Sequence, residues 1–286
     1  MVELPAEPGQ SRGLRYLQVN ESFDSFQSVG SEEKGLLGGG LYYDHFVPPA
    51  WWSRREGPWR VLVLGLGAGT AVRVLEGCLP PGMELSTVGV ELDPVVVEVG
   101  RQWFGLEDDR PERRAISDLD ARAALRALEP GSFDQVILDC YANAVEIPPH
   151  LSTVEFFNEL QGVLRDGGWI TLNAAGFGLE DPVVQALASS LAEGVQERIL
   201  ATRVPFSRNC MLHARRGNEP PEPGSRSWQV PHSELARTLS PLELPGAWSW
   251  VAPGGTGGTL LTDDHSPMER LQASSIEAGR RRWVAD

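Results

Sequence analysis

The sequence predicts an α/β protein with a doubly wound, mostly parallel sheet, preceded by a small N-terminal β segment. Two observations carry this prediction. A near-continuous apolar run at residues 60–65 is typical of a parallel strand that is covered on both faces. After it, expected strands alternate with stretches of helical patterning, and this alternation indicates βαβ units and a parallel sheet.

The expected elements follow one another in this order. A polar tail at 1–13 precedes two short strands with alternating patterning at 14–20 and 25–29. The strands of the main sheet are expected at 60–65, 85–91, 112–116, 133–139 and 167–173. Helices are expected at 71–77, 93–104, 119–128, 152–164 and 182–193, and a final antiparallel pair at 198–204 and 209–215.

Two helix starts have recognisable capping residues. Asp93 precedes Pro94, which places an N-cap carboxylate directly before a proline at the first helical position. Ser152 and Glu155 have the spacing of a capping box, so we expect the helix at 152–164 to begin there.

These elements divide the chain into three parts. An N-terminal β-hairpin and entry segment spans residues 1–55, and the α/β domain spans 56–216. A Gly- and Pro-rich linker at 217–224 begins an irregular C-terminal extension, 217–286, in which one short helix is expected at 232–238.

Composition excludes several classes of protein. The net charge of −14 argues against a nucleic-acid partner, because such binding needs a basic surface. The longest uncharged, apolar-leaning run, 61–72, is too short for the ~20 residues of a membrane span, so no membrane partner is expected. Three scattered cysteines and an N-terminus without a secretory signal indicate a reducing, cytoplasmic location.

A glycine loop and a carboxylate predict a nucleoside pocket. Gly65, Gly67 and Gly69 follow a buried strand and open a helix, where glycines let a ligand approach the main chain. Glu91 ends the next strand, where its carboxylate can accept hydrogen bonds from ribose hydroxyls. The alternative is that the glycines serve only the packing of a tight strand–helix turn.

Two further carboxylates end predicted strands. Asp120 can accept a hydrogen bond from an adenine amino group; alternatively it caps a helix, although Asp118 is also a candidate for the cap. Asp139 ends the fourth strand of the sheet, and strand ends at a switch point line the ligand crevice. The alternative for Asp139 is a solvated loop carboxylate.

At these residues the chain resembles a known family. The block from 61 to 176 is similar to the class I, Rossmann-like S-adenosylmethionine-binding domains, and among them to the spermidine synthase family of aminopropyltransferases. The motifs that carry the resemblance are Gly65-x-Gly-x-Gly, Val88-Gly-Val-Glu-Leu-Asp-Pro, Asp120-Ala-Arg, Phe133-Asp-Gln-Val-Ile-Leu-Asp, Leu151-Ser-Thr-Val-Glu-Phe-Phe, Phe26-Gln27-Ser28, Tyr42-Tyr-Asp-His-Phe and Leu261-Thr-Asp-Asp-His-Ser-Pro-Met-Glu.

The resemblance implies a role for each matching residue. Gln27 and Glu91 would bind the ribose region of the donor, and Asp120 would bind its adenine. Asp139 would lie beside the reacting amine, and Tyr42 would line the pocket. It also implies a decarboxylated S-adenosylmethionine or S-adenosylmethionine donor, a small-molecule amine acceptor and a place in polyamine biosynthesis.

The chain departs from the family at two positions. Ala68 stands where the family's glycine loop normally carries an Asp that holds the amino group of the donor. Ala142 stands where the catalytic loop, normally Asp-Ser-Ser-Asp, carries its second carboxylate. Glu146 and His150 are the nearby candidates to replace that carboxylate, and the identity of the acceptor is left open.

Three functions agree with this pattern. The first is aminopropyl transfer to an amine, the second is S-adenosylmethionine-dependent methyl transfer on the same domain, and the third is non-catalytic nucleoside binding. The five histidines have no paired ligand spacing, so no metal is expected. Asp263-Asp264-His265 is interpreted as a loop near the mouth of the site or a chain-end contact. The oligomeric state, a homodimer included, is left open.

Overall fold

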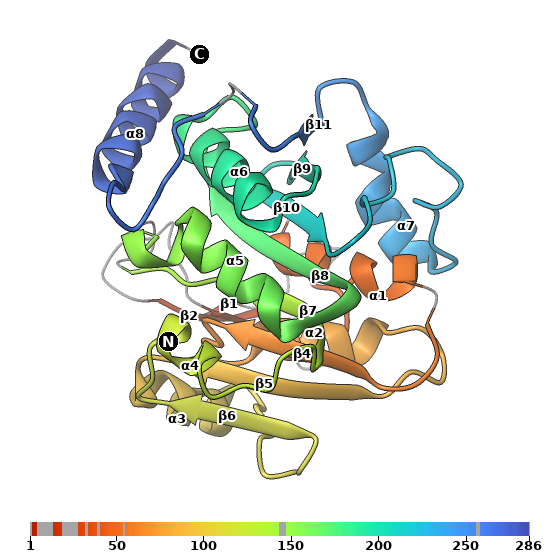
Figure 1. Ribbon diagram of the computed structural model, residues 1–286. Helices are drawn as coiled ribbons and strands as arrows, with labels where there is room; N and C mark the ends of the chain where they lie inside the picture. Colours follow the sequence, from red (N-terminus) through yellow and green to blue (C-terminus); the bar gives the residue numbers. More distant parts are fainter. Residues whose placement is uncertain are drawn as a thin grey trace.

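A central eight-stranded sheet with helices on both faces forms the body of the protein (Figure 1). Its strand order is β11-β9-β10-β8-β7-β4-β5-β6. The computed structural model describes residues 2–4, 14–18, 28–31, 34–38, 41–53, 55–142, 147–255 and 258–285.

One half of the sheet is parallel, as the sequence predicts. Its strands are β4 (Trp59–Leu64), β5 (Leu85–Glu91), β6 (Arg113–Ser117), β7 (Phe133–Leu138) and β8 (Leu164–Ala175). Every neighbouring pair among them, from β8 through β7, β4 and β5 to β6, runs parallel. The carboxyl ends of these strands therefore lie along one edge of the sheet, which is where ligands bind in such folds.

The other half is antiparallel. β9 (Ile199–Arg203) and β10 (Asn209–Arg215) form the expected hairpin, and β10 also pairs with β8. β11 (Trp248–Val251) extends the sheet beside β9. The expectation that 217–286 is irregular is wrong at this point, because the region supplies a strand to the main sheet.

A separate three-stranded antiparallel sheet forms the N-terminal part of the described chain. Its strands are β1 (Val2–Leu4), β2 (Leu14–Leu17) and β3 (Ser28–Ser31). The expected loose tail thus contains a strand, since β1 pairs with β2. Of the strand predicted at 25–29, residues 28 and 29 lie in β3, which continues to Ser31, and residues 25–27 lie outside the described part.

The helices cover both faces of the sheet. The described helices are η1 (Tyr42–Phe46), α1 (Pro48–Ser53), α2 (Thr70–Cys78), α3 (Pro94–Trp103), α4 (Ala121–Leu125), η2 (Pro149–Leu151), α5 (Val154–Val163), α6 (Pro182–Val195), α7 (Ser233–Leu239), η3 (Ser240–Glu243) and α8 (Met268–Ala285). One hydrophobic core joins the sheet to α4, α5 and α6. The other joins its opposite face to η1, α1, α2 and α7.

The caps agree with the sequence in one case and differ in another. The Asp93 carboxylate accepts a hydrogen bond from the Val95 N–H, so the N-cap of α3 is confirmed. The predicted capping box at Ser152 is wrong, because Thr153 is the N-cap of α5 and accepts from the Phe156 N–H. Ser152 and Thr153 are adjacent hydroxyl residues and offer the same capping signal in the sequence. The structure shows which of the two hydroxyls caps the helix.

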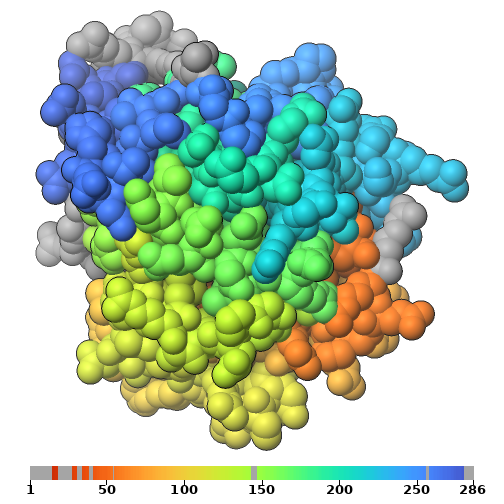
Figure 2. Space-filling view, in the orientation of Figure 1, coloured from red at the N-terminus to blue at the C-terminus, as the bar shows by residue number. Residues whose placement is uncertain are grey.

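The C-terminal region is held against the rest by side chains. Ser275 of α8 donates a hydrogen bond of 2.6 Å to the carboxylate of Asp181, the N-cap of α6. On the face seen in Figure 2, the blue C-terminal segments lie beside the green surface of α5 and α6.

The short helix expected at 232–238 is confirmed as α7. Within the described chain, no helix combines the length and apolar character needed to span a membrane.

Two helical glycines give opposite expectations for the same substitution. A Cβ on Gly194 of α6 would lie 2.6 Å from both the Phe157 Cβ and the Val154 carbonyl oxygen of α5, whereas one on Gly162 would meet nothing within 4 Å. We expect Gly194→Ala to lower the free energy of unfolding by about 1–3 kcal/mol through overpacking. Gly162→Ala should raise it by about 0.5–1 kcal/mol. Urea unfolding of both variants measures this; equal effects would contradict the α5–α6 packing.

Candidate active site

The glycine loop connects β4 to α2 at the carboxyl edge of the sheet. Gly65, Gly67 and Gly69 have φ values of 81°, 55° and 89°, a left-handed conformation that glycine adopts most readily. A Cβ on Gly65 would lie 2.3 Å from the carbonyl oxygen of Asp139, so only glycine fits there. The loop is therefore held directly against the end of β7.

Glu91 holds the loop from the β5 side. Its Oε2 accepts a hydrogen bond of 2.8 Å from the Gly67 N–H, and its Oε1 accepts one of 3.2 Å from the Asp93 N–H. The side chain is buried, with 8% of its surface exposed. Each carboxylate oxygen has a second acceptor position, so the residue can support the loop and still accept from a ligand hydroxyl.

Asp139 and Tyr42 are brought together from distant parts of the chain. The Tyr42 hydroxyl, on η1, donates to Asp139 Oδ2 over 3.0 Å. Asn173, near the end of β8, donates from Nδ2 to Asp139 Oδ1 over 2.8 Å. Each oxygen of this half-buried carboxylate thus has one donor.

The surroundings of Asp139 raise its pKa. Burial raises the pKa from the ordinary 3.8 to about 6, and the charge of Glu91 acts in the same direction. Hydrogen bonds from Asn173 and Tyr42 oppose the rise. A carboxylate with a pKa near 6 is mostly ionised at neutral pH and is a stronger base than an exposed aspartate. Burial and the Asp139 charge also raise the pKa of Tyr42, which stays a neutral donor.

Asp120 lies at the start of α4 and is its N-cap. Its Oδ1 accepts hydrogen bonds of 3.0 Å from the Arg122 and Ala123 N–H groups. The assignment of the cap to Asp118 is wrong, because Asp118 has φ 60° and precedes the helix by three residues. The His150 Nε2 lies 2.8 Å from Asp120 Oδ2. Although burial acts to raise the Asp120 pKa, these hydrogen bonds outweigh it, and the pKa lies below its usual value.

Strand β3 packs directly on the glycine loop. The Ser28 hydroxyl accepts a hydrogen bond of 2.7 Å from the Ala68 N–H. Thr70 exchanges two hydrogen bonds with the main chain of Val29, of 2.8 and 2.9 Å. Gln27, the predicted ribose ligand that precedes this strand, lies outside the described residues.

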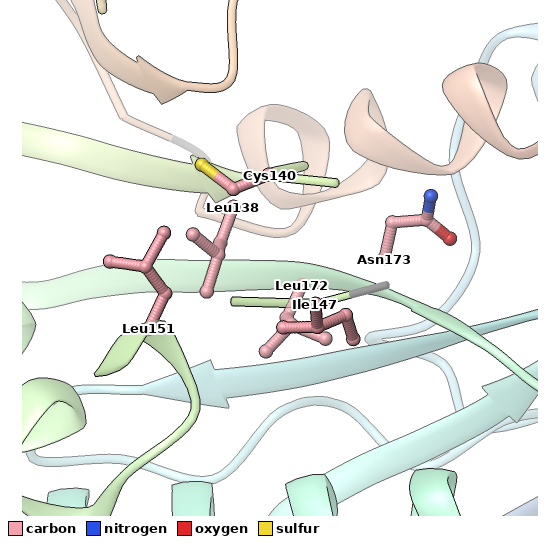
Figure 3. A pocket seen from close by; sticks show the side chains of 6 residues that line it. All are labelled: Leu138, Cys140, Ile147, Leu151, Leu172 and Asn173. Atoms are coloured by element: carbon pink, nitrogen blue, oxygen red, sulfur yellow. The ribbon is translucent and has the colours of Figure 1, made fainter. Parts of the chain in front are cut away.

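A small cavity lies between the ends of β7 and β8 and the segment that leads into α5 (Figure 3). Its volume of about 10 Å³ is at the limit for a single water molecule. The lining residues are Leu138, Cys140, Ile147, Leu151, Leu172 and Asn173. In Figure 3 the amide of Asn173 stands apart from the apolar side chains. Burial raises the pKa of the Cys140 thiol well above its usual value, so Cys140 is not a reactive thiolate.

Of the two residues considered as substitutes for the second carboxylate, the structure describes only His150. Glu146 lies outside the described residues, and the half-exposed His150 side chain is paired with Asp120. The Tyr141 hydroxyl is also engaged, since it donates to the Asn173 carbonyl oxygen over 2.5 Å and accepts from the Ala175 N–H. Tyr141 therefore fastens the end of β8 instead of offering its hydroxyl to a ligand.

The sequence did not single out Asn173, or Arg122 as a link to the C-terminal chain. Asn173 could have been noticed only as a polar residue near the end of a strand whose last residues are mostly apolar. Arg122 donates to Asp263 over 2.7 and 2.8 Å and to Glu159, and Thr153 donates to the same Asp263. Through Asp263, the C-terminal part of the chain thus contacts the start of α4.

Among the described residues, His, Cys, Asp and Glu side chains nowhere gather in threes that could hold a metal ion.

The fold and the position of these residues define an α/β protein of the spermidine synthase and class I methyltransferase type. The structure is similar to that of a probable spermidine synthase from Corynebacterium glutamicum, with a TM-score of 0.62 at 19% identity, covering 93% of this chain and 97% of the other. No family model matches the sequence.

Curated relatives name the family. The chain is 30% identical to a polyamine aminopropyltransferase of Vibrio vulnificus over 225 residues, 75% of this chain and 70% of the relative. It is 27% identical to a probable polyamine aminopropyl transferase of Bifidobacterium longum, over 92% of this chain and 61% of that protein, so it spans about three fifths of the latter's length. The chain belongs to the polyamine aminopropyltransferase family.

A shorter similarity points to methyltransferases. Over 119 residues, 40% of this chain and 20% of the relative, the chain is 36% identical to an N-terminal histidine N-methyltransferase of Emericella nidulans.

The raised pKa of Asp139 predicts a pH-dependent stability. Between 3.8 and about 6 the folded protein retains a proton that the unfolded chain has released, so stability falls as pH rises through this window. Asn carries no such proton. We expect Asp139→Asn to gain stability relative to wild type from about pH 4 to about pH 6, by about 1–3 kcal/mol, and to keep that difference above pH 6.

Urea unfolding at several pH values measures this difference. Asp166→Asn is the matched control, since the Asp166 side chain is 99% exposed, and its effect should not follow the same window. A difference between Asp139→Asn and wild type that does not change between pH 4 and pH 6 would contradict the raised pKa.

Proposed function

We propose that this protein transfers an aminopropyl group from decarboxylated S-adenosylmethionine to a small-molecule amine, with Asp139 as the carboxylate beside the reacting nitrogen. The observation that carries the proposal is the hydrogen-bonded pair of Asp139 and Tyr42 at the carboxyl edge of the sheet. Family membership supports the reaction type. The proposal places the protein in polyamine biosynthesis and in the cytoplasm.

The chemistry needs an unprotonated amine more than an activated donor. The acceptor nitrogen attacks the aminopropyl carbon attached to the sulfonium, the carbon–sulfur bond breaks, and methylthioadenosine leaves with the bonding electrons. An alkylamine has a pKa near the ~10.4 of lysine, so a base must take its proton. Asp139, with a pKa of about 6, is ionised at neutral pH and can accept it. The aromatic ring of Tyr42 supports the nearby cation.

The donor's nucleoside is assigned to the other strand ends. The glycine loop lets the donor approach the main chain, and Glu91 accepts hydrogen bonds from the ribose. Asp120 is assigned to the adenine amino group, for which a free acceptor position on its carboxylate remains beside His150. Gln27 keeps its assignment to the ribose region as a prediction.

Methyl transfer from S-adenosylmethionine is the second candidate. Ala68 keeps it in play, because loss of the loop carboxylate that would hold the donor's amino group weakens the case for any one donor arm. The similarity to the Emericella nidulans methyltransferase is the observation that favours methyl transfer. A protein that binds the nucleoside without catalysis is the third reading, and product analysis separates the three.

Glu91→Gln tests the nucleoside assignment. The amide removes one charged acceptor, so we expect methylthioadenosine to bind about 1–3 kcal/mol more weakly by calorimetric titration. Glu84→Gln is the matched control, because Glu84 is exposed and precedes the start of β5 while Glu91 ends the same strand. Unchanged affinity in a folded Glu91→Gln protein would remove the ribose assignment.

Asp139→Asn tests the reaction. Turnover should fall by about 10²–10⁴, the range for removing a positioned proton acceptor, while methylthioadenosine affinity stays within a few-fold. The wild-type rate should rise with pH as more of the amine loses its proton. Asp166→Asn should behave as wild type.

The assay supplies each donor with a panel of diamines, triamines and monoamines. Methylthioadenosine released from the decarboxylated donor supports aminopropyl transfer, and S-adenosylhomocysteine released from S-adenosylmethionine selects methyl transfer. Binding of both donors without any product would show that the protein has kept the pocket and lost the chemistry.

A further inference from the structure

A line of side chains leads from Asp139 to the turn between β9 and β10. Asn173 donates from Nδ2 to Asp139 Oδ1 over 2.8 Å, and Asn209 donates from its Nδ2 to Asn173 Oδ1 over 2.8 Å. Ser207, in the turn, donates its hydroxyl to Asn209 Oδ1 over 2.5 Å. We call Asn173, Asn209 and Ser207 the amide relay.

The sheet register places the relay. Asn173 of β8 pairs with Met211 of β10, and Asn209 pairs with Ala175, so the two asparagines are diagonal neighbours across an antiparallel pair. The Val204 N–H donates to the Asn209 carbonyl oxygen and closes the hairpin. The register of β8 and β10 therefore fixes the Cα positions from which the side chains of Asn173 and Asn209 extend.

Each amide of the relay has a defined direction. A primary amide donates from one side and accepts on the other. Because Ser207 donates to the oxygen of Asn209, the nitrogen of Asn209 faces Asn173. Because Asn173 accepts there, its own nitrogen faces Asp139. Asn173 is 3% exposed, so an unmatched amide would lose a hydrogen bond that water does not replace.

We propose that Asn173 and Asn209 are positioning residues for Asp139: their ordered amides hold the carboxylate in one orientation, with a donor on each oxygen, ready to take the acceptor's proton. The proposal rests on the proposed function, because it concerns the same carboxylate. Asn209 acts without touching Asp139, through the direction it imposes on Asn173.

The charges around Asp139 explain why a neutral donor matters. In the described part of the chain no cation faces it: the facing groups are Glu91, whose charge raises the Asp139 pKa, and Tyr42, Tyr43, Cys140 and Tyr141, which are neutral because their own pKa values are raised. Burial raises the Asp139 pKa to about 6, and the hydrogen bond from Asn173 is the first of the interactions that limit this rise. Loss or reversal of that bond raises the pKa further.

Three substitutions at the relay give a graded test. In Asn209→Asp the new carboxylate only accepts, so the Asn173 amide turns its nitrogen toward residue 209 and its oxygen toward Asp139. In Asn209→Ala the Asn173 amide only loses the hydrogen bond that sets its direction. A purely structural role predicts the opposite order of severity, because alanine removes more atoms. Ser207→Ala, in the exposed turn, is the mildest change and should fold normally.

The readout is the pKa of Asp139 itself, measured by NMR on protein labelled with ¹³C at the aspartate carboxyl. The Asp139 signal is the one that disappears in Asp139→Asn. We expect its pKa to rise by about one unit in Asn209→Asp and by about half as much in Asn209→Ala. Asn209→Ala adds no charge, so its rise separates loss of the relay from the direct effect of a new carboxylate. Asn218→Asp, exposed beyond the far end of β10, controls for the change in net charge, and there the pKa should stay unchanged.

Turnover gives a second readout. Asn209→Asp should lower kcat at pH 7 by about twofold, because a rise of the Asp139 pKa from about 6 to about 7 lowers its ionised fraction there from about 0.9 to about 0.5. The loss should be larger at pH 6 and should disappear at higher pH, with methylthioadenosine affinity unchanged. An unchanged Asp139 pKa in both Asn209→Asp and Ser207→Ala would overturn the relay. If the pKa moves while wild type yields no product with any donor, the proposed function fails and the relay stands. If product forms and the pKa does not respond, only the relay fails.

Discussion

A main-chain contact between β4 and β7 is the constraint on which the site depends. The space in which a Gly65 Cβ would lie is taken by the carbonyl group of Asp139, and the Asp139 N–H donates to the Leu64 carbonyl oxygen over 2.9 Å. The glycine loop and the Asp139 carboxylate are therefore held at a fixed separation by backbone atoms. A donor bound over the loop would have its reactive end directed by this contact, not by flexible side chains.

The neighbouring elements build on that contact from both sides. From β5, Glu91 accepts from the loop N–H of Gly67, and from β3, Ser28 accepts from that of Ala68. From η1, Tyr42 reaches Asp139 with a buried hydroxyl, which is where a tyrosine must find a polar partner. Residues far apart in the sequence meet because parallel strands end along one edge.

Local patterns allowed the parallel half of the fold to be predicted, and register explains much of what was missed. Apolar runs, and carboxylates at their ends, located β4, β5 and β7 together with Glu91 and Asp139. Asn173 and Asn209 were not found, because their contact depends on the antiparallel pairing of β8 with β10. The caps at Asp120 and Thr153 were misplaced or left open because a residue one or two positions earlier carries an equivalent side chain. The strand β11 was missed for want of a strong local pattern.

Two of the carboxylates at the edge of the sheet, Asp120 and Asp139, differ in what their surroundings favour. Asp120 has a partly exposed side chain, and donors on both oxygens lower its pKa despite burial, so it stays charged and suits binding. For Asp139, burial and the charge of Glu91 raise the pKa toward neutrality, which suits proton transfer. When the environments of two carboxylates give them different pKa values, one can serve to bind a ligand and the other to accept a proton. Under the proposed function, this difference would put the reacting amine at the ends of β7 and β8 and the nucleoside toward β5 and β6.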